Sequence, residues 1–353
     1  MLLKIKHIYN TSINLDDILK NVDKEKQYTI PIFIPHLGCK HQCVFCNQRK
    51  ISGNLKCPST EEIITTIEEH LKYFENSKEK IQIAFFGGSF TGIDIHKQEE
   101  YLKIAYSYIE EGKVDSIRLS TRPDYINDEI LQLLKRYKVK SIELGVQTMN
   151  EDVLIASKRG HTSKDVISAA KLITLYGFDL GFQIMIGLPK STVQKEVETI
   201  NELLKYSPKE LRIYPVYVIN PSELYDMYLD GRYKPLTMED AIYRSYMVMK
   251  QCQKSDIKVI RIGLQTTSEI TQKNSEIIGP VCDNFAEYVL AKLVLDKLEE
   301  IINGIKNKEP DIDEIMFNLD NKKFESIIIG PKKINQRYII NKYGILIKTN
   351  KVS

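Results

Sequence analysis

The chain alternates short apolar, β-branched runs with longer segments in which apolar residues recur at helical spacing. The runs predict strands at Pro31 to His36, Ile81 to Phe86, Ser116 to Thr121, Ser141 to Val146, Leu180 to Ile186, Leu211 to Val216 and Ile257 to Ile262. The segments between them predict helices at Thr60 to Ser77, His96 to Glu111, Asn127 to Tyr137, Ser163 to Tyr176, Val193 to Tyr206 and Thr237 to Lys254. This alternation predicts an α/β fold with a parallel sheet. Six or seven such units indicate a partial or complete (β/α) barrel, with an open doubly wound sheet as the alternative.

The pattern changes near residue 300, which predicts three parts: an N-terminal leader at 1–30, a barrel domain at 31–299 and a small C-terminal α+β unit at 300–353. A polar, acidic stretch follows the barrel, and Glu300 to Glu309 are expected to form the linker. The segment from Phe324 to Asn350 reads as strand, basic turn, helix and strand.

Charge and hydropathy exclude a chain that is basic over its whole surface and a chain that spans a membrane. The 50 basic and 47 acidic residues give a net charge of +3, so any nucleic-acid site must be a local patch. No apolar run reaches the roughly 20 residues that span a bilayer, and the N-terminus lacks the apolar segment of a secretory signal peptide. We therefore expect a cytoplasmic protein without a membrane partner.

Three cysteines follow the first predicted strand in a C-x3-C-x2-C arrangement: Cys39, Cys43 and Cys46. Such clustering in a large chain without a secretory signal favours metal ligation over disulfides. Three thiolates can hold three irons of a 4Fe-4S cluster and leave the fourth iron open for a chelating ligand. The alternative is a structural zinc, which would need a fourth ligand such as His36 or His41. The other three cysteines are isolated and receive no role.

The cysteine loop, with the aromatic Phe45 just before Cys46, resembles that of radical S-adenosylmethionine (SAM) enzymes. The resemblance implies that the open iron binds the amino and carboxylate groups of SAM. An electron from a flavodoxin- or ferredoxin-type donor then cleaves the sulfonium to give a 5'-deoxyadenosyl radical. In this superfamily the residue matching Phe45 packs near the adenine.

Glycines and polar residues at the ends of the following strands extend this resemblance. Paired glycines let the backbone approach a ligand closely, and polar strand ends line the mouth of a barrel. Plain solvated loop starts are the alternative for any one of them. The residues expected to bind the cofactor are Phe45, Gly87, Gly88, Ser89, Glu143, Gln147, Arg159 and Gly187.

A more specific resemblance runs from about residue 31 to residue 290. The segments GGSF, STRPDY, IELGVQ, KRGHT and LRIYPVYVI, followed by ELYDMYLDGRYKP, resemble the radical domain of the catalytic subunit of the Elongator complex. That family modifies the wobble uridine of tRNA at carbon 5 with a group from acetyl-CoA. Because only about sixty residues follow residue 290, too few for an acetyltransferase domain, the use of acetyl-CoA stays open.

The C-terminal segment partly resembles a KH module, with Gly330, Lys332 and Lys333 where a GxxG loop would hold a nucleic-acid backbone. The second glycine is replaced by Lys333, and a small cap with a solvated basic turn is the alternative. Two other functions stay open for the whole chain. One is a radical enzyme acting on a small molecule or tetrapyrrole, as in relatives of oxygen-independent coproporphyrinogen oxidase. The other is a non-catalytic iron-sulfur protein that binds RNA.

Overall fold

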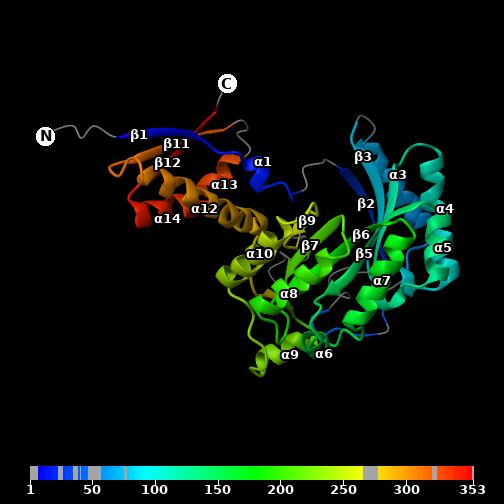
Figure 1. Cartoon of the computed structure of the whole chain (residues 1–353). Coiled ribbons are helices and arrows are strands. Elements are labelled where there is room, and N and C mark those ends of the chain that lie inside the picture. The colour runs from blue at the N-terminus through cyan, green and yellow to red at the C-terminus, as the bar shows by residue number, and fades with distance from the viewer. Residues whose placement is uncertain are drawn as a thin grey trace.

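The computed structural model describes residues 7–22, 27–34, 39, 41–46, 57–74, 78–264, 277–319 and 324–351. Its centre is a sheet of seven parallel strands that curves into an open half-barrel (Figure 1). The strands are β2 (Gln27–Ile34), β3 (Lys80–Gly87), β4 (Ser116–Thr121), β5 (Val139–Gln147), β6 (Asp179–Ile186), β7 (Glu210–Pro215) and β9 (Lys258–Ile262). They neighbour one another in chain order, so β2 and β9 form the two edges.

Helices connect successive strands across the outer face of the sheet. They are α3 (Thr60–Phe74), α4 (Ile95–Glu110), α5 (Asp128–Arg136), α7 (Ser163–Leu175), α8 (Val193–Leu204) and α10 (Met238–Cys252). Side-chain oxygens of Asn127, Thr162, Thr192 and Thr237 accept hydrogen bonds from the first turns of the helices that follow them. The predicted α/β alternation is therefore confirmed. Strand order never reverses along the sheet, which excludes the doubly wound alternative.

Alternation along the strands separates an apolar face from a polar one. Side chains at successive positions of a strand point to opposite faces. The apolar members, which are completely or almost completely buried, belong to the main core: Phe85, Leu119, Leu144, Ile184 and Ile213. The residues directly before four of them are polar and lie on the opposite face: Arg118, Glu143, Gln183 and Arg212. The inner wall of the half-barrel thus carries charge across its middle strands.

A second, smaller unit lies beyond β9 (Figure 1). Its three parallel strands have the order β1 (Ile8–Ser12), β11 (Glu314–Leu319) and β12 (Leu346–Lys351). Three helices accompany this sheet: α12 (Phe285–Lys306), α13 (Glu325–Ile329) and α14 (Ile334–Tyr343). The long helix α12 also packs against α10 and so joins the unit to the half-barrel.

This unit corrects three expectations. Residues 8–12 are not a leader, since they pair in register with β11, and the barrel itself begins at Gln27. The expected linker at Glu300 to Glu309 is largely helical, because apolar residues of α12 such as Ile302 and Ile305 are buried. The strand expected after Phe324 is helix α13, whose Ile327 and Ile328 are buried and which ends at Ile329, before Gly330. Whether the unit folds as a separate domain stays a prediction.

The remaining α-helices and β-strands of the described chain are short: α1 (Leu15–Ile18), α6 (Glu151–Ala156), β8 (Val218–Ile219), α9 (Glu223–Leu229) and β10 (Ile277–Ile278). The two-residue strands β8 and β10 pair antiparallel. Within the residues that the structure describes, no helix combines the length and apolarity needed to cross a bilayer.

Candidate functional site at the carboxyl ends of the strands

The cysteine loop follows β2 and is held by backbone hydrogen bonds to distant segments. The Val44 N–H donates to the Ser157 carbonyl over 3.2 Å, and the Val44 carbonyl accepts from the Leu224 N–H over 2.8 Å. Val44 is buried, and Phe45 packs beside it against a small apolar cluster that includes Leu188. The loop is therefore anchored between Cys43 and Cys46 by main-chain and apolar contacts. His36, the first candidate for a fourth zinc ligand, lies outside the described residues.

The glycine segment after β3 meets this loop. Gly87 has φ +99°, and a Cβ there would lie 2.6 Å from the Ile34 carbonyl oxygen, so only glycine fits. The Gly88 N–H donates to the same oxygen over 2.6 Å. Ser89 is buried, and its Oγ lies 3.4 Å from the Cys39 Sγ. The structure thus brings Gly87, Gly88 and Ser89 beside the first cysteine.

Two buried guanidinium groups lie behind Cys43. Arg159 donates from Nη1 to the Cys43 Sγ over 3.1 Å, and its Nη2 donates to the Gly145 carbonyl. Arg122 donates to the Arg159 carbonyl over 2.6 Å and forms a two-bond pair with Asp124. A cation that donates to sulfur stabilises the thiolate, which is the metal-binding form of cysteine. Arg159 therefore contacts one of the three expected cluster ligands directly.

Gln147 ends β5 in a conformation that side chains rarely adopt, with φ +67°. A register shift in the pairing of β5 with β6 lies at the same point. The Gln147 Oε1 is buried and has no hydrogen-bond partner within the described part of the chain. Strained residues with unsatisfied polar atoms are concentrated at ligand sites, which fits the expected cofactor role of Gln147.

Glu143 lies in the middle of β5, where positive charges from two other strands surround it. Its carboxylate accepts from the Arg212 Nε over 2.6 Å and from the Gln183 Nε2 over 3.0 Å, and it pairs with Arg118 at 2.5 Å. Arg118 also pairs with Glu210. Burial opposes ionisation of Glu143, but the two guanidinium groups outweigh it and hold its pKa below the ordinary range. Glu143 therefore holds the side chains of Arg118, Arg212 and Gln183 in place on the inner wall. Direct contact of Glu143 with a cofactor stays a prediction.

Gly187 follows β6 with φ +89° and is fixed on both sides of its peptide unit. Its N–H donates to the Glu196 carboxylate over 2.8 Å, and its carbonyl accepts from the Tyr233 hydroxyl over 2.7 Å. A Cβ at this position would lie 2.6 Å from the Leu236 side chain. Gly187 therefore lies between the inner wall and a neighbouring pocket that Leu236 also lines.

The sequence of the half-barrel matches a known superfamily over most of its length. The Radical SAM superfamily matches residues 33–203, and the Radical_SAM C-terminal domain matches residues 208–294. The chain belongs to the radical SAM superfamily. All of the cluster and cofactor residues expected from the sequence lie in the first of these ranges, whereas Arg212 and Tyr233 lie in the second.

Individual relatives of this radical SAM protein place it near the Elongator catalytic subunit. It is 30% identical over 194 residues to the tRNA uridine(34) acetyltransferase of Methanocaldococcus jannaschii, covering 49% of this chain and 36% of the relative. It is 31% identical over 230 residues to the uncharacterised protein MJ0486 of the same archaeon, covering 62% and 70%. The solved structure of an N-terminally truncated Elp3 of Methanocaldococcus infernus shares the fold, with a TM-score of 0.63 at 22% identity, covering 78% and 64%. The expected Elongator resemblance is confirmed, although the chain spans only about a third of the acetyltransferase.

Membership of the radical SAM superfamily implies a 4Fe-4S cluster and SAM, and the residues present fit both groups. No disulfide joins any of the six cysteines, all of which the structure describes. Around Arg159, which contacts Cys43, the buried atoms Arg122 Nη1, Arg159 Nε and Gln147 Oε1 have no hydrogen-bond partner among the residues described, as expected next to a ligand site. No three acidic, histidine or cysteine side chains of the described ranges converge around one point, so the fit rests on the donor set. Cys39, Cys43 and Cys46 would hold the cluster.

When bound, the cluster supplies the electron that cleaves SAM, and the chain supplies the surroundings. Arg159 donates to the Cys43 sulfur, while Ser89 and the glycines before it lie beside Cys39, where they would contact the methionine end of SAM. Arg159 and Val44, which lie next to Cys43, are both buried, so water is excluded from the side of Cys43 that they cover. These residues thus bind and orient, and SAM and the cluster supply the chemistry.

His161 gives a pH dependence that can be tested without iron. Burial, with Arg159 and Arg122 nearby, lowers its pKa to about 3, so it is neutral at physiological pH. The unfolded chain takes up this proton below about pH 6.5 and the folded chain does not. We expect the free energy of unfolding to fall, by up to about 1.4 kcal/mol per pH unit from this group, as the pH drops below 6.5. Urea titrations of the metal-free protein at pH 7.0, 6.0 and 5.0 measure this slope.

The matched variants for this prediction are His161→Asn and His96→Asn. His161→Asn should flatten the pH dependence, whereas the exposed His96 should leave it as in the wild type. An equal slope in all three proteins would show that His161 takes up its proton as readily in the folded chain as in the unfolded chain.

Several residues of this region were not expected from the sequence. Arg118 and Arg212 occupy single positions inside strands, and Glu196 and Arg244 come from helices. A lone arginine within an apolar strand is a usable signal, because a buried guanidinium requires an acidic partner. Glu196 and Arg244 carry no such signal, since they lie at ordinary helical positions and meet only in the folded chain.

Proposed function

We propose that this radical SAM protein modifies the uridine at position 34 of tRNA. The proposal rests on the similarity of 194 residues of this chain to tRNA uridine(34) acetyltransferases. Its support from the structure is that the cysteine loop, Gly87 to Ser89, Gln147 and Arg159 lie together at the carboxyl ends of the strands, which is where barrel enzymes bind substrates. The reaction needs a one-electron donor of the flavodoxin or ferredoxin type.

Within this proposal the chain binds SAM beside Cys39 and exposes the target base to the inner wall of the half-barrel. Arg212 lies over the ring of Phe86, with 5.2 Å between guanidinium carbon and ring centroid; Phe86 is half-buried, and 15% of the Arg212 side chain is exposed. Aromatic rings and guanidinium planes are the groups on which proteins stack unpaired RNA bases. The inner wall therefore offers a stacking surface for an extruded uracil.

The test is anaerobic turnover of the reconstituted protein with unmodified tRNA, in parallel with and without acetyl-CoA. Nucleosides released from the tRNA are identified by mass spectrometry, and a tRNA carrying cytidine at position 34 is the control. We expect a new uridine derivative that requires SAM, reductant and uridine 34. Formation of deoxyadenosine with every nucleoside unchanged would contradict tRNA as the substrate. The two arms with and without acetyl-CoA decide whether that compound supplies the added group.

The basic turn between α13 and α14 is the second element proposed to contact RNA. Lys332 and Lys333 are exposed and adopt φ values of +50° and +60°. The buried Asn335 fixes the turn by donating to the carbonyls of Ala291, Ile327 and Ile328. No acidic side chain among the described residues pairs with either lysine, so both charges face solvent on a rigid turn. The KH-like character of this turn stays a prediction.

We expect Lys332→Glu combined with Lys333→Glu to weaken RNA binding. Each phosphate contact that is lost lowers the number of counterions released when the RNA binds. The logarithmic salt dependence of the affinity should fall by about 0.7 for each contact with single-stranded RNA. Fluorescence anisotropy with a tRNA anticodon stem-loop at several salt concentrations measures it. Lys164→Glu with Lys171→Glu, on the exposed face of α7, makes the same charge change as a control. Equal salt slopes for the two variants would remove this turn from the RNA surface.

A further inference from the structure

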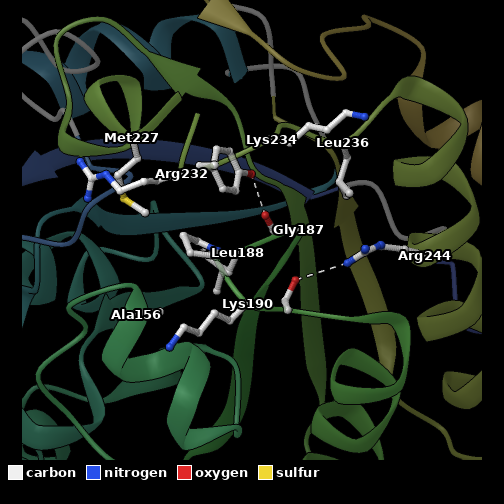
Figure 2. Close-up of a pocket in the computed structure, with 12 residues that line it drawn as sticks. Ala156, Gly187, Leu188, Lys190, Met227, Arg232, Lys234, Leu236 and Arg244 are labelled. Carbon is white, nitrogen blue, oxygen red and sulfur yellow. Dashed lines mark hydrogen bonds between the residues drawn. The ribbon is translucent and has the colours of Figure 1, made fainter. Parts of the chain in front are cut away.

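A pocket of about 280 Å³ lies outside the cysteine loop, where β6 passes into α8 (Figure 2). Four segments line it: Ala156 at the end of α6, residues 187–191 after β6, the end of α9 with the residues that follow it, and Arg244 of α10. No cysteine is among its lining residues in the described chain. It is therefore separate from the expected cluster site, although Gly187 contributes to both regions.

The floor of this pocket is apolar and held in place. Leu188 and Tyr233 are buried, and the Tyr233 hydroxyl is fixed to the Gly187 carbonyl. Leu236 and the half-buried Met227 add aliphatic surface on two sides (Figure 2). A floor of this kind accepts a planar or apolar group such as a nucleobase, which packs without needing hydrogen-bond partners.

The rim of the same pocket is basic. Lys190, Arg232 and Lys234 are exposed around it, and Arg244 lies partly buried on α10 (Figure 2). Arg232 pairs with Asp230 at 2.6 Å, and Arg244 pairs with Glu196 at 3.1 Å. Neither Lys190 nor Lys234 has an acidic partner among the residues described.

Two positive charges therefore remain uncompensated at this one pocket, in a chain whose net charge is only +3. The first turn of α8, a helix of 12 residues, begins beside it at Val193 and adds the positive end of its dipole. An apolar floor with an uncompensated basic rim matches a ligand that carries an aromatic ring and an anionic group close together.

We propose that this pocket binds a nucleoside phosphate, supplied by a nucleotide of the RNA substrate next to the target base. The inference rests on the proposed function, because it takes RNA as the substrate. Leu188 links the two sites physically, since it lines the pocket and also belongs to the apolar cluster that holds Val44 of the cysteine loop. A nucleotide seated here lies one side-chain layer from that loop, which would hold the neighbouring nucleotide at the mouth of the half-barrel.

Binding to the metal-free full chain tests this without turnover. The probes are a fluorescent anticodon stem-loop RNA and uridine 5'-monophosphate. Lys190→Glu with Lys234→Glu reverses the rim charge, and Met227→Trp fills the pocket without changing charge. Lys103→Glu with Lys138→Glu, on exposed sites across the half-barrel, is the charge-matched control. Thermal unfolding of each variant checks that it is folded.

We expect both pocket variants to raise the Kd for the RNA by about tenfold, while the control pair stays within about twofold of the wild type. Weaker binding of uridine 5'-monophosphate as well would show that the pocket accepts the free nucleotide, and loss confined to RNA would show that it needs the chain. Unchanged RNA affinity in folded Met227→Trp, or equal losses in the two lysine pairs, would overturn the proposal. If the affinities change as expected but no uridine is modified, the pocket stands and the proposed reaction fails.

Discussion

Replacing Cys43 by alanine should abolish cluster binding and SAM cleavage while leaving the protein folded. Cys43 is the middle ligand of the expected cluster, and its sulfur is the one that Arg159 contacts. Loss of a residue that only orients a metal ligand already costs about 10- to 100-fold, so loss of a ligand should cost more than about 100-fold in deoxyadenosine formation. Iron and sulfide content after anaerobic reconstitution, with the visible absorption of the cluster, provide the measurement.

Cys57→Ala is the matched control for this prediction, because Cys57 lies only eleven residues beyond Cys46 and packs against the core. It should keep full iron content and full activity. Circular dichroism of Cys43→Ala should match that of the wild type, since the loop lies on the mouth of the half-barrel. A Cys43→Ala protein that still binds four irons and cleaves SAM would contradict the assignment of the ligands.

Replacing Glu143 by alanine should have the largest effect on stability. The substitution leaves the guanidinium groups of Arg118 and Arg212 buried beside a missing carboxylate, although Arg118 keeps Glu210. Removing one partner of a buried ion pair typically costs about 3 to 5 kcal/mol. Urea unfolding of the metal-free protein at pH 7 should show a loss of this size. Because the pKa of Glu143 is lowered by its partners, the difference from the wild type should shrink once the pH falls below about 4.

Glu111→Ala provides the comparison for Glu143. Glu111 pairs with Lys113 at the surface, where both side chains are about half exposed. Such pairs contribute about 0 to 1 kcal/mol, so its loss should be close to the error of the measurement. Equal effects of the two substitutions would mean that the inner wall is open to water and that its charges are screened.

Strand and helix positions in the half-barrel were predictable because each carries a strong local signal. The run Ile81 to Phe86 and the capped helix after Thr162 are decided by their own residues. The second unit was less predictable, since its edge strand β1 is supplied by residues 8–12, some 300 residues before its partner β11. Ile327 to Ile329 favoured a strand by β-branching, yet packing of α13 on α12 made them helical.

The candidate site divides in the same way. The cysteines and the glycines after β3 were found because their spacing or backbone requirements are visible in the sequence. Arg159 was found through a resemblance, whereas its contact with Cys43 spans 116 positions and required the fold. The pocket beside Gly187 was not expected, because its basic rim gathers Lys190, Lys234 and Arg244 from three separate segments.

Reductive cleavage of SAM by the wild-type protein tests most directly whether this chain is a radical SAM enzyme. The chain is reconstituted anaerobically with iron and sulfide, reduced with dithionite in the presence of SAM, and assayed for 5'-deoxyadenosine by liquid chromatography and mass spectrometry. We expect deoxyadenosine in excess of enzyme, dependent on reductant and absent in Cys43→Ala. A fully loaded and reduced protein that forms none, with or without tRNA and acetyl-CoA, would contradict this expectation and favour a non-catalytic iron-sulfur protein.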